Sequence, residues 1–357
     1  MRHLAFLIVL FAFASSAVAA APAAETSMKF TKLSVKDPGI NNIEAVSFLI
    51  PAGWNVEGGV QWFPDYSILA NLLMRITDPQ TGATIEFLPI QNFTYIEQPV
   101  MPMQRGQNYM GNIVWEPVKD VPTFVQTFYA PTVLKHLQGA RAVDRQRLDK
   151  VAAEVERSYG GKSQVVAEKV RYQFDANGRP WEEDVYVTLV FTPWQMGTMW
   201  SVSSAYSFRA PQGMLDRMTP LMSTSISTMR LSLDWYAGYR QVQDLFSKRM
   251  YQDIKNAAEL SKTITRNAEY TRQLYADAYK ERQASQDRIS ESFGEYIRGV
   301  DTYKNPYEDR PVQLPAGYND AWVNAKGEYL LSNDANLNPN VGDTTEWRRM
   351  DRRDEKR

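Results

Sequence analysis

Three long segments in the middle of the chain alternate apolar and polar residues in the period that predicts β-strands. The apolar stripes are Val166, Val170, Tyr172 and Phe174; Val185, Val187, Leu189 and Phe191; and Trp200, Val202, Tyr206 and Phe208. Asn177-Gly178, between the first two segments, is a strong signal for a tight hairpin turn. One-sided stripes on successive strands predict an antiparallel sheet with one face covered by helices.

Flanking segments extend this picture to residues 26–234. Shorter strands are expected at 28–36, 45–51, 69–77 and 83–89, the last two joined by a turn at 78–82. Helices are expected at 123–138, 147–159 and 211–229, with breaks near Pro131 and Pro220. We therefore predict an α+β sandwich domain over residues 26–234.

A family resemblance accompanies these elements. Pro51-Ala52-Gly53-Trp54-Asn55-Val56 closes a strand, Asp78-Pro79-Gln80-Thr81-Gly82 forms a hairpin turn, and a long meander and closing helix follow. Together they resemble the α/β/α sandwich of PsbP- and Mog1-like domains, over about two-thirds of the chain. The Pro- and Met-rich stretch in the centre departs from that pattern. The resemblance implies work in binding or assembly rather than catalysis, and it transfers no functional residue.

Residues 235–298 contain no proline and predict a long amphipathic helix. The apolar positions, at steps of mostly three and four, are Val242, Phe246, Met250, Ile254, Ala257, Ile264, Ala268, Tyr275, Ala278, Ile289 and Phe293. The stripe is interrupted by polar residues such as Ser261 and Arg282, which a dimeric coiled coil would replace by Leu or Ile. A helix lying across the sandwich and a self-associating coil both remain open.

Residues 299–350 are rich in aromatic residues and predict a small β-meander, followed by a charged tail at 351–357. Its Leu-Pro-x-Gly-aromatic segment, hairpin and distant tryptophan are similar to a WW domain. The candidate binding residues are Tyr303, Tyr307, Tyr318, Trp322, Tyr329 and Trp347. Such rings stack on Pro-rich peptides or sugars. They could equally form the core of a small domain that has no disulfide.

The N-terminus predicts a secretory signal at residues 1–19. A basic start is followed by an apolar run over 4–14 and by small residues up to Ala20, the pattern of a cleaved signal rather than of a membrane span. We therefore expect a periplasmic or extracellular protein with no transmembrane segment in the mature chain. The cleavage region has no cysteine to carry a lipid anchor.

Composition then limits the chemistry. The 357 residues include no Cys and carry a formal net charge of -1, which excludes thiolate chemistry and gives no field to attract nucleic acid. His136 is the only imidazole beyond the predicted signal, and we expect it at the surface or boundary of a helix rather than in catalysis. No nucleotide-binding or nucleophile motif occurs, so we predict no catalytic residue, no metal centre and no cofactor.

Two oxygen-rich segments remain as candidates for a site. Alternation places Glu182 and Asp184 on one face of a strand and Glu183 on the other, beside Trp181. Paired carboxylates can hydrolyse a glycan, although charged residues at a hairpin are commonly solvated. The segment 334–343 repeats Asp and Asn as calcium loops do, but Asx turns explain that composition as well.

These observations favour an exported, non-enzymatic adaptor or assembly protein of the cell envelope, whose partner is a protein. The alternative is a protein that binds cell-wall glycan or hydrolyses it with carboxylates.

Overall fold

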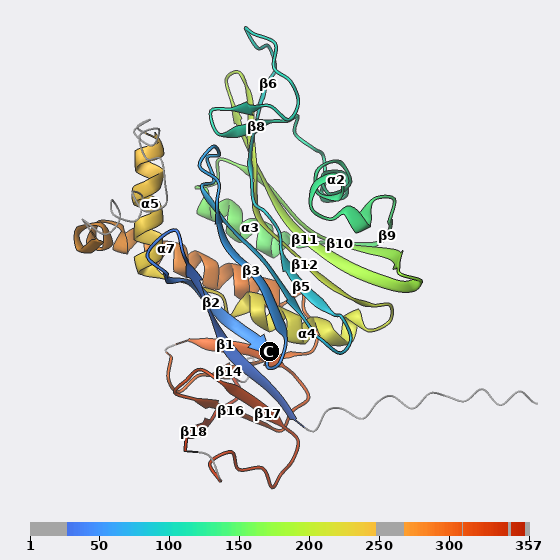
Figure 1. Ribbon diagram of the computed structural model, residues 1–357, viewed down its shortest axis with the longest axis vertical. Helices are drawn as coiled ribbons and strands as arrows, with labels where there is room; N and C mark the ends of the chain where they lie inside the picture. Colours follow the sequence, from blue (N-terminus) through green and yellow to red (C-terminus); the bar gives the residue numbers. More distant parts are fainter. Residues whose placement is uncertain (1–26, 248–267, 309, 342–343, 354–357) are drawn as a thin grey trace, which may run out of the picture.

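The computed structural model describes residues 27–247, 268–308, 310–341 and 344–353. The predicted signal at 1–19, residues 248–267 of the predicted long helix and the last four residues of the tail lie outside this range. Within it the chain forms two large, mainly antiparallel sheets and one two-stranded sheet, with helices packed on them, so the general α+β expectation is confirmed (Figure 1). No helix among these residues is long and apolar enough to cross a membrane.

The larger sheet has the strand order β3-β4-β5-β12-β11-β10-β9. Its strands are β3 (Asn55–Trp62), β4 (Ala70–Thr77), β5 (Thr84–Phe87), β9 (Arg141–Arg147), β10 (Gln164–Ala176), β11 (Arg179–Trp194) and β12 (Gly197–Pro211). Three short strands join it beside β12, namely β6 (Asn92–Ile96), β7 (Asn108–Tyr109) and β8 (Asn112–Val114). Asn177 and Gly178 both adopt positive φ in the β10–β11 turn, as the sequence predicts.

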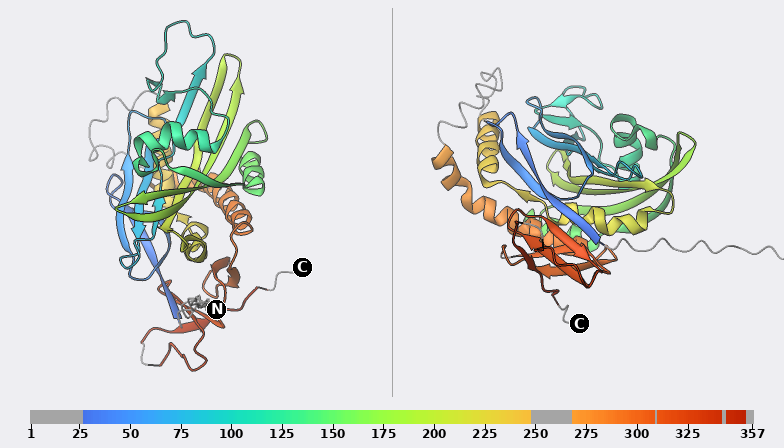
Figure 2. Two further views of the ribbon diagram at one scale, coloured as in Figure 1. Left: turned by 90° about the vertical axis from the view of Figure 1, so that its right-hand side faces the viewer. Right: turned by 60° about the horizontal axis from the view of Figure 1, so that its bottom comes forward.

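Helices cover both faces of this sheet, and not one face only. On one face lie α1 (Val121–Phe124), a π-helical turn (Val125–Tyr129), α2 (Ala130–Thr132) and a 3₁₀ turn (Lys135–Leu137). On the other lie α3 (Asp149–Ser158), α4 (Leu215–Ser227) and the end of α7 (Ala268–Gly294). Figure 2 shows the sheet curling around the first group. Both sides of β11 are therefore buried.

A β-bulge in β12 changes the predicted stripe of the third strand. The register with β11 shifts between Thr188 and Leu189, so that Leu189 faces Val202 but Thr188 faces Ser204. Trp200 and Val202 consequently pack under α1, whereas Tyr206 and Phe208 pack on the opposite face. One extra residue reverses the alternation, as a bulge does.

The second sheet joins the two ends of the described chain in the order β13-β2-β1-β17-β16-β18. Its strands are β1 (Ser27–Asp37), β2 (Ile43–Pro51), β13 (Arg230–Leu231), β16 (Asp320–Asn324), β17 (Tyr329–Ser332) and β18 (Trp347–Arg349). The hairpin β14 (Val300–Lys304) and β15 (Pro311–Pro315) lies beside it. Residues 299–350 thus extend the sheet begun by β1. The strand order of the expected meander is corrected, because β16 lies between β17 and β18.

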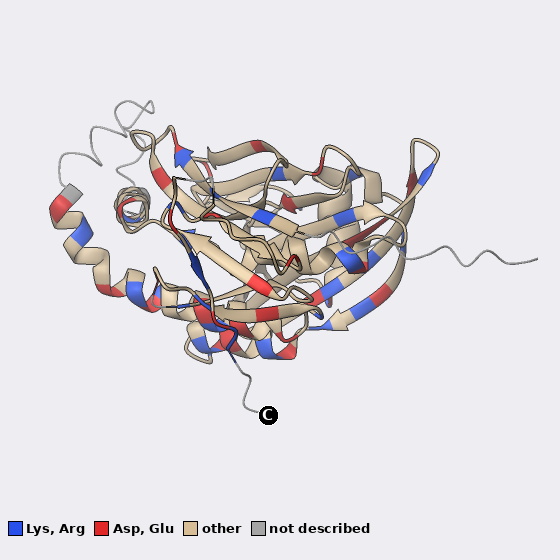
Figure 3. Cartoon of the chain, turned by 90° about the horizontal axis from the view of Figure 1, so that it is seen from below, with Lys and Arg blue, Asp and Glu red and all other residues tan. Residues whose placement is uncertain are grey.

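The single long helix expected over 235–298 is also corrected. The structure describes α5 (Leu233–Ser247) and α7, and these two helices pack against each other. The ring centroids of Tyr236 and Tyr279 lie 6.0 Å apart, whereas one straight helix would separate these residues by roughly 65 Å. The chain therefore folds back between the two helices, whose charged residues have mixed sign (Figure 3).

Candidate functional site

The structure buries four of the six aromatic candidates. Tyr303, Tyr318, Tyr329 and Trp347 are buried, and the first three pack in one cluster with residues of β1, β2 and α4. Only Tyr307 and Trp322 keep part of their surface accessible. The six rings therefore do not form one exposed stacking platform, because joining β1 makes most of them the core of the second sheet.

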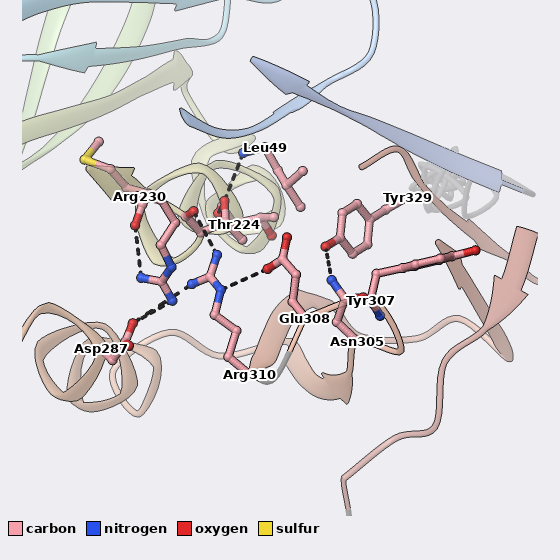
Figure 4. A network of polar contacts seen from close by, with 11 residues as sticks. Leu49, Thr224, Arg230, Asp287, Asn305, Tyr307, Glu308, Arg310 and Tyr329 are labelled. Carbon is pink, nitrogen blue, oxygen red and sulfur yellow. Dashed lines mark hydrogen bonds and ion pairs between the residues drawn. The ribbon is translucent and has the colours of Figure 1, made fainter. Parts of the chain in front are cut away.

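Polar contacts anchor these aromatic strands to the rest of the molecule (Figure 4). Asn305 Nδ2 donates to the Tyr329 hydroxyl at 2.7 Å, which satisfies a phenol that would otherwise be buried without a partner. Arg310 lies between Glu308 and Asp287 of α7, with Nε 3.0 Å from the nearer Glu308 oxygen. The segment is thereby fixed to α7, consistent with a structural role.

The carboxylates of β11 alternate between faces as predicted, but all three are buried rather than solvated. Glu182 accepts the backbone N–H of Gly213 at 2.8 Å, just before α4. Asp184 forms two 2.7 Å hydrogen bonds with the Arg171 guanidinium. Each acid thus has a structural partner, and Glu182 and Asp184 are not available as a pair to an external glycan.

Glu183, on the opposite face, contacts the single imidazole of the described chain, and the two form an ion pair when that imidazole is protonated. His136 Nε2 lies 2.5 Å from Glu183 Oε2, and the imidazole packs against the Phe174 ring. Burial of Glu183 opposes its ionisation, but the hydrogen bond and charge of His136 and the charge of Arg209 outweigh it. Together they hold the pKa of Glu183 below its ordinary value. His136 is therefore no simple surface residue.

Three buried polar atoms in this region, Tyr172 Oη, Glu183 Oε1 and Ser207 Oγ, make no hydrogen bond of normal geometry. Ser207 nevertheless lies close enough to Glu183 to lower its pKa, as Gln126 does for Tyr172. Tyr172 and Glu183 face each other across β10 and β11, and burial raises the pKa of Tyr172 to about 12. The acid and the phenol of this cluster are both screened from solvent.

The Asx-rich segment uses its side chains to shape its own backbone. Asp334 Oδ1 accepts the N–H of Asn336, and Asn338 Oδ1 accepts the N–H of Asn340. Asn340 in turn bonds both backbone groups of Trp347. These are Asx-turn contacts. Within the ranges described, no cluster of three or more acidic or histidine side chains could hold a metal ion.

The helix pair α5–α7 forms the most accessible candidate site. A pocket of about 290 Å³ lies between the two helices and the β1–β2 loop. Its lining includes Ile40, Ile43, Ala237 and Gly238. At the rim, Arg272 bonds Asp234 with an Nε–Oδ1 distance of 2.7 Å. Ligand pockets are on the order of 300–1,000 Å³, so this one suits one or two side chains better than a cofactor.

Two large apolar side chains stand exposed on a face of α7 that points away from this pocket. Tyr270 is 69% exposed and Leu274 is 57% exposed, one turn apart on α7. An α-helix turns by about 100° per residue, so both lie on a different side of α7 from Thr271 and Arg272, which line the pocket. We call this exposed face of α7, with Tyr270 and Leu274, the arm surface. Sequence reasoning missed it because the packing of α7 on α5 decides which face stays uncovered, although the i, i+4 spacing of the exposed pair is visible in the sequence.

The helix pair α5–α7 is attached to the rest of the molecule at two points. Asp37, wholly buried, accepts the indole N–H groups of Trp62 and Trp235 and the backbone N–H of Gly39. At the other end of α7, Phe293 packs edge-on against Tyr186 and Tyr206 of the larger sheet. The arm surface is therefore held on a rigid base.

No family model matches the sequence, and no curated protein matches it. The chain is similar to a crystal structure from Bacteroides thetaiotaomicron VPI-5482 at 11% sequence identity and a TM-score of 0.22. The similarity covers 79% of this chain and 85% of that one.

Proposed function

We propose that this chain is an exported, non-enzymatic binding protein that engages a protein partner through the arm surface. The observation that carries the proposal is the exposed pair Tyr270 and Leu274 on one face of α7. Side chains at i and i+4 on one helix face are the usual contacts of helix-to-helix recognition. The partner that fits is an amphipathic helix whose apolar residues pack against Tyr270 and Leu274.

The arm surface suits a protein partner better than a free small molecule, because Tyr270 and Leu274 project from a helix face and are not among the residues that line the α5–α7 pocket. Because the helices are held by Asp37 and Phe293, binding orders little additional chain.

The experiment places a photo-crosslinking amino acid at position 273, on the exposed side of α7, in the full chain expressed in its own host. A partner so identified is purified, and its dissociation constant for the full chain is measured. Tyr270→Ser with Leu274→Ser should weaken binding at least about tenfold, since each buried apolar side chain contributes about 1.5–3 kcal/mol. The matched control is Tyr159→Ser with Val143→Ser, an exposed aromatic and an exposed aliphatic residue elsewhere.

Equal affinities of the two double variants for that partner would contradict the proposal. Sedimentation of the purified chain provides a separate test. A dimer that dissociates in the Tyr270→Ser, Leu274→Ser variant would assign the arm surface to self-association instead of to a partner.

A further inference from the structure

A second exposed apolar surface lies at the end of the larger sheet that is farthest from the C-terminal strands (Figures 1 and 2). It is formed by the loop after β6, residues 97–103, and by the β11–β12 hairpin, residues 193–199. Pairing of β6 with β12 brings them together, since Ile96 faces Gly197 and the Glu97 N–H donates to the Met196 carbonyl at 3.0 Å. We call these two segments the tip.

The tip exposes large apolar side chains on both of its segments. Val100 is fully exposed, Met101 is 72% exposed and Met196 is 56% exposed, and Met199 and Trp194 are also exposed. They account for five of the fourteen large apolar side chains that are exposed in the described chain, within two short segments. Such a concentration marks an interaction surface, whereas scattered exposed residues do not.

The tip also has almost no charge. Residues 185–208 contain no Asp, Glu, Lys, Arg or His, and neither do residues 98–104. Glu97 is the single charged residue of the tip. A surface that recognises a particular protein usually has charged and hydrogen-bonding groups around its apolar centre, and these set the orientation of the partner.

The tip is held rigidly by the strands behind it. A Cβ on Gly197 would lie 2.0 Å from the Tyr95 carbonyl oxygen, so glycine permits the close approach of β6 to the hairpin. Behind them Trp200 stacks on Phe93 at 4.1 Å, and its indole N–H donates to the Trp115 carbonyl at 2.8 Å. The exposed side chains therefore project from a fixed base.

We propose that the tip inserts into the interfacial region of a lipid bilayer and attaches the protein to a membrane surface. The tip consists of two projecting loops that carry flexible Met side chains beside the exposed Val100, and this suits a fluid apolar medium better than a shaped pocket. Trp194 and the half-buried Tyr95 lie at the base of these loops, and amphipathic rings of this kind favour the boundary between headgroups and acyl chains. Because the tip is almost uncharged, attachment needs no anionic lipid. It is independent of the partner proposed for the arm surface.

The test is co-sedimentation of the full chain with large vesicles of pure phosphatidylcholine. We expect binding that changes less than about twofold between roughly 0.05 and 0.5 M salt, since screening acts on charge pairs and not on apolar insertion. Met101→Asp and Met196→Asp, one substitution in each segment, should each weaken binding at least about tenfold. Val143→Asp and Tyr159→Asp, exposed apolar positions outside the tip, should bind like the parent chain.

Vesicles that contain brominated lipids measure how deeply the tip inserts into the bilayer. Subtracting the fluorescence of Trp194→Phe from that of the parent chain isolates the emission of Trp194. This emission should be quenched more by bromine near the headgroups than by bromine near the chain ends. Circular dichroism of each variant checks that the chain is folded. We expect the fold to be retained because each substituted side chain is exposed.

Three results would overturn the proposal: no binding to phosphatidylcholine vesicles, binding that the tip substitutions leave unchanged, or binding that requires anionic lipid and is lost in salt. A protein crosslinked at the tip without any vesicle binding would assign the surface to a protein partner and would equally overturn it.

Discussion

Replacement of His136 by alanine should destabilise the fold through the carboxylate that it leaves behind. Glu183 is wholly buried, and its Oε2 lies 2.5 Å from the imidazole, so His136→Ala leaves a buried charge near Arg209 alone. Breaking a buried ion pair by removing one partner costs about 3–5 kcal/mol. Since the imidazole is 25% exposed and Arg209 compensates in part, we expect a loss of about 3 kcal/mol in the free energy of unfolding.

The assay is urea unfolding of the full chain, followed by tryptophan fluorescence. A loss of about 3 kcal/mol lowers the midpoint by at least about 1 M. The control is the double variant His136→Ala with Glu183→Gln, which buries no charge and should therefore be more stable than His136→Ala by at least about 1 kcal/mol. The reasoning would be refuted if the stability losses of the two single substitutions simply added in the double variant, or if His136→Ala lost less than about 1 kcal/mol.

The same ion pair determines a dependence on pH. The folded chain holds the pKa of Glu183 below the ordinary value of 4.5, so the unfolded chain takes up this proton at a higher pH than the folded chain does. The stability that Glu183 contributes is therefore complete above that value and is lost as the pH falls through the folded pKa. The difference in unfolding free energy between the parent chain and Glu183→Gln should shrink only below about pH 4.5. This assignment would be contradicted if that difference stayed constant down to a pH at which Glu183 is protonated in both the folded and the unfolded chain.

Three further substitutions test other contacts. Arg171→Met removes both 2.7 Å bonds to the buried Asp184 and should cost about 3–4 kcal/mol in urea unfolding, with Arg171→Lys recovering less than half. Gly197→Ala places a Cβ against the Tyr95 carbonyl, so β6 must move away from β12. We expect a loss of about 2 kcal/mol and faster amide exchange at the tip. Asp37→Asn weakens the acceptor of two indoles and should cost about 2 kcal/mol, seen as faster amide exchange in α5.

Several local features could be predicted from the sequence because their causes lie within a few residues. The Asn177-Gly178 turn joins β10 to β11, the turn at 78–82 joins β4 to β5, and α3 spans most of its expected range. The alternation of Glu182 and Glu183 between faces was also predicted correctly. Their burial was not, because it depends on segments that come from elsewhere in the chain to cover both faces.

The candidate sites depend even more on contacts between distant segments. The spacing of Tyr303, Tyr329 and Trp347 is the same whether these rings are exposed or buried, and pairing with β1 decides which of the two occurs. The arm surface depends on the packing of α7 on α5, and the tip needs β6 to pair with β12. None of these pairings can be predicted from the local periodicity of apolar residues.

The sequence by itself determined several turns and the long alternating strands, because backbone preference and the period of apolar residues act over a few neighbours. It also determined the absence of thiol chemistry and the uncharged stretch at 185–208. Only the tertiary structure decided which apolar side chains are left uncovered. Burial requires one face to be matched by another, and here the matching faces are as far apart as β1 and β17. For this reason the aromatic residues near the C-terminus became core, while Tyr270, Leu274 and the tip became surface.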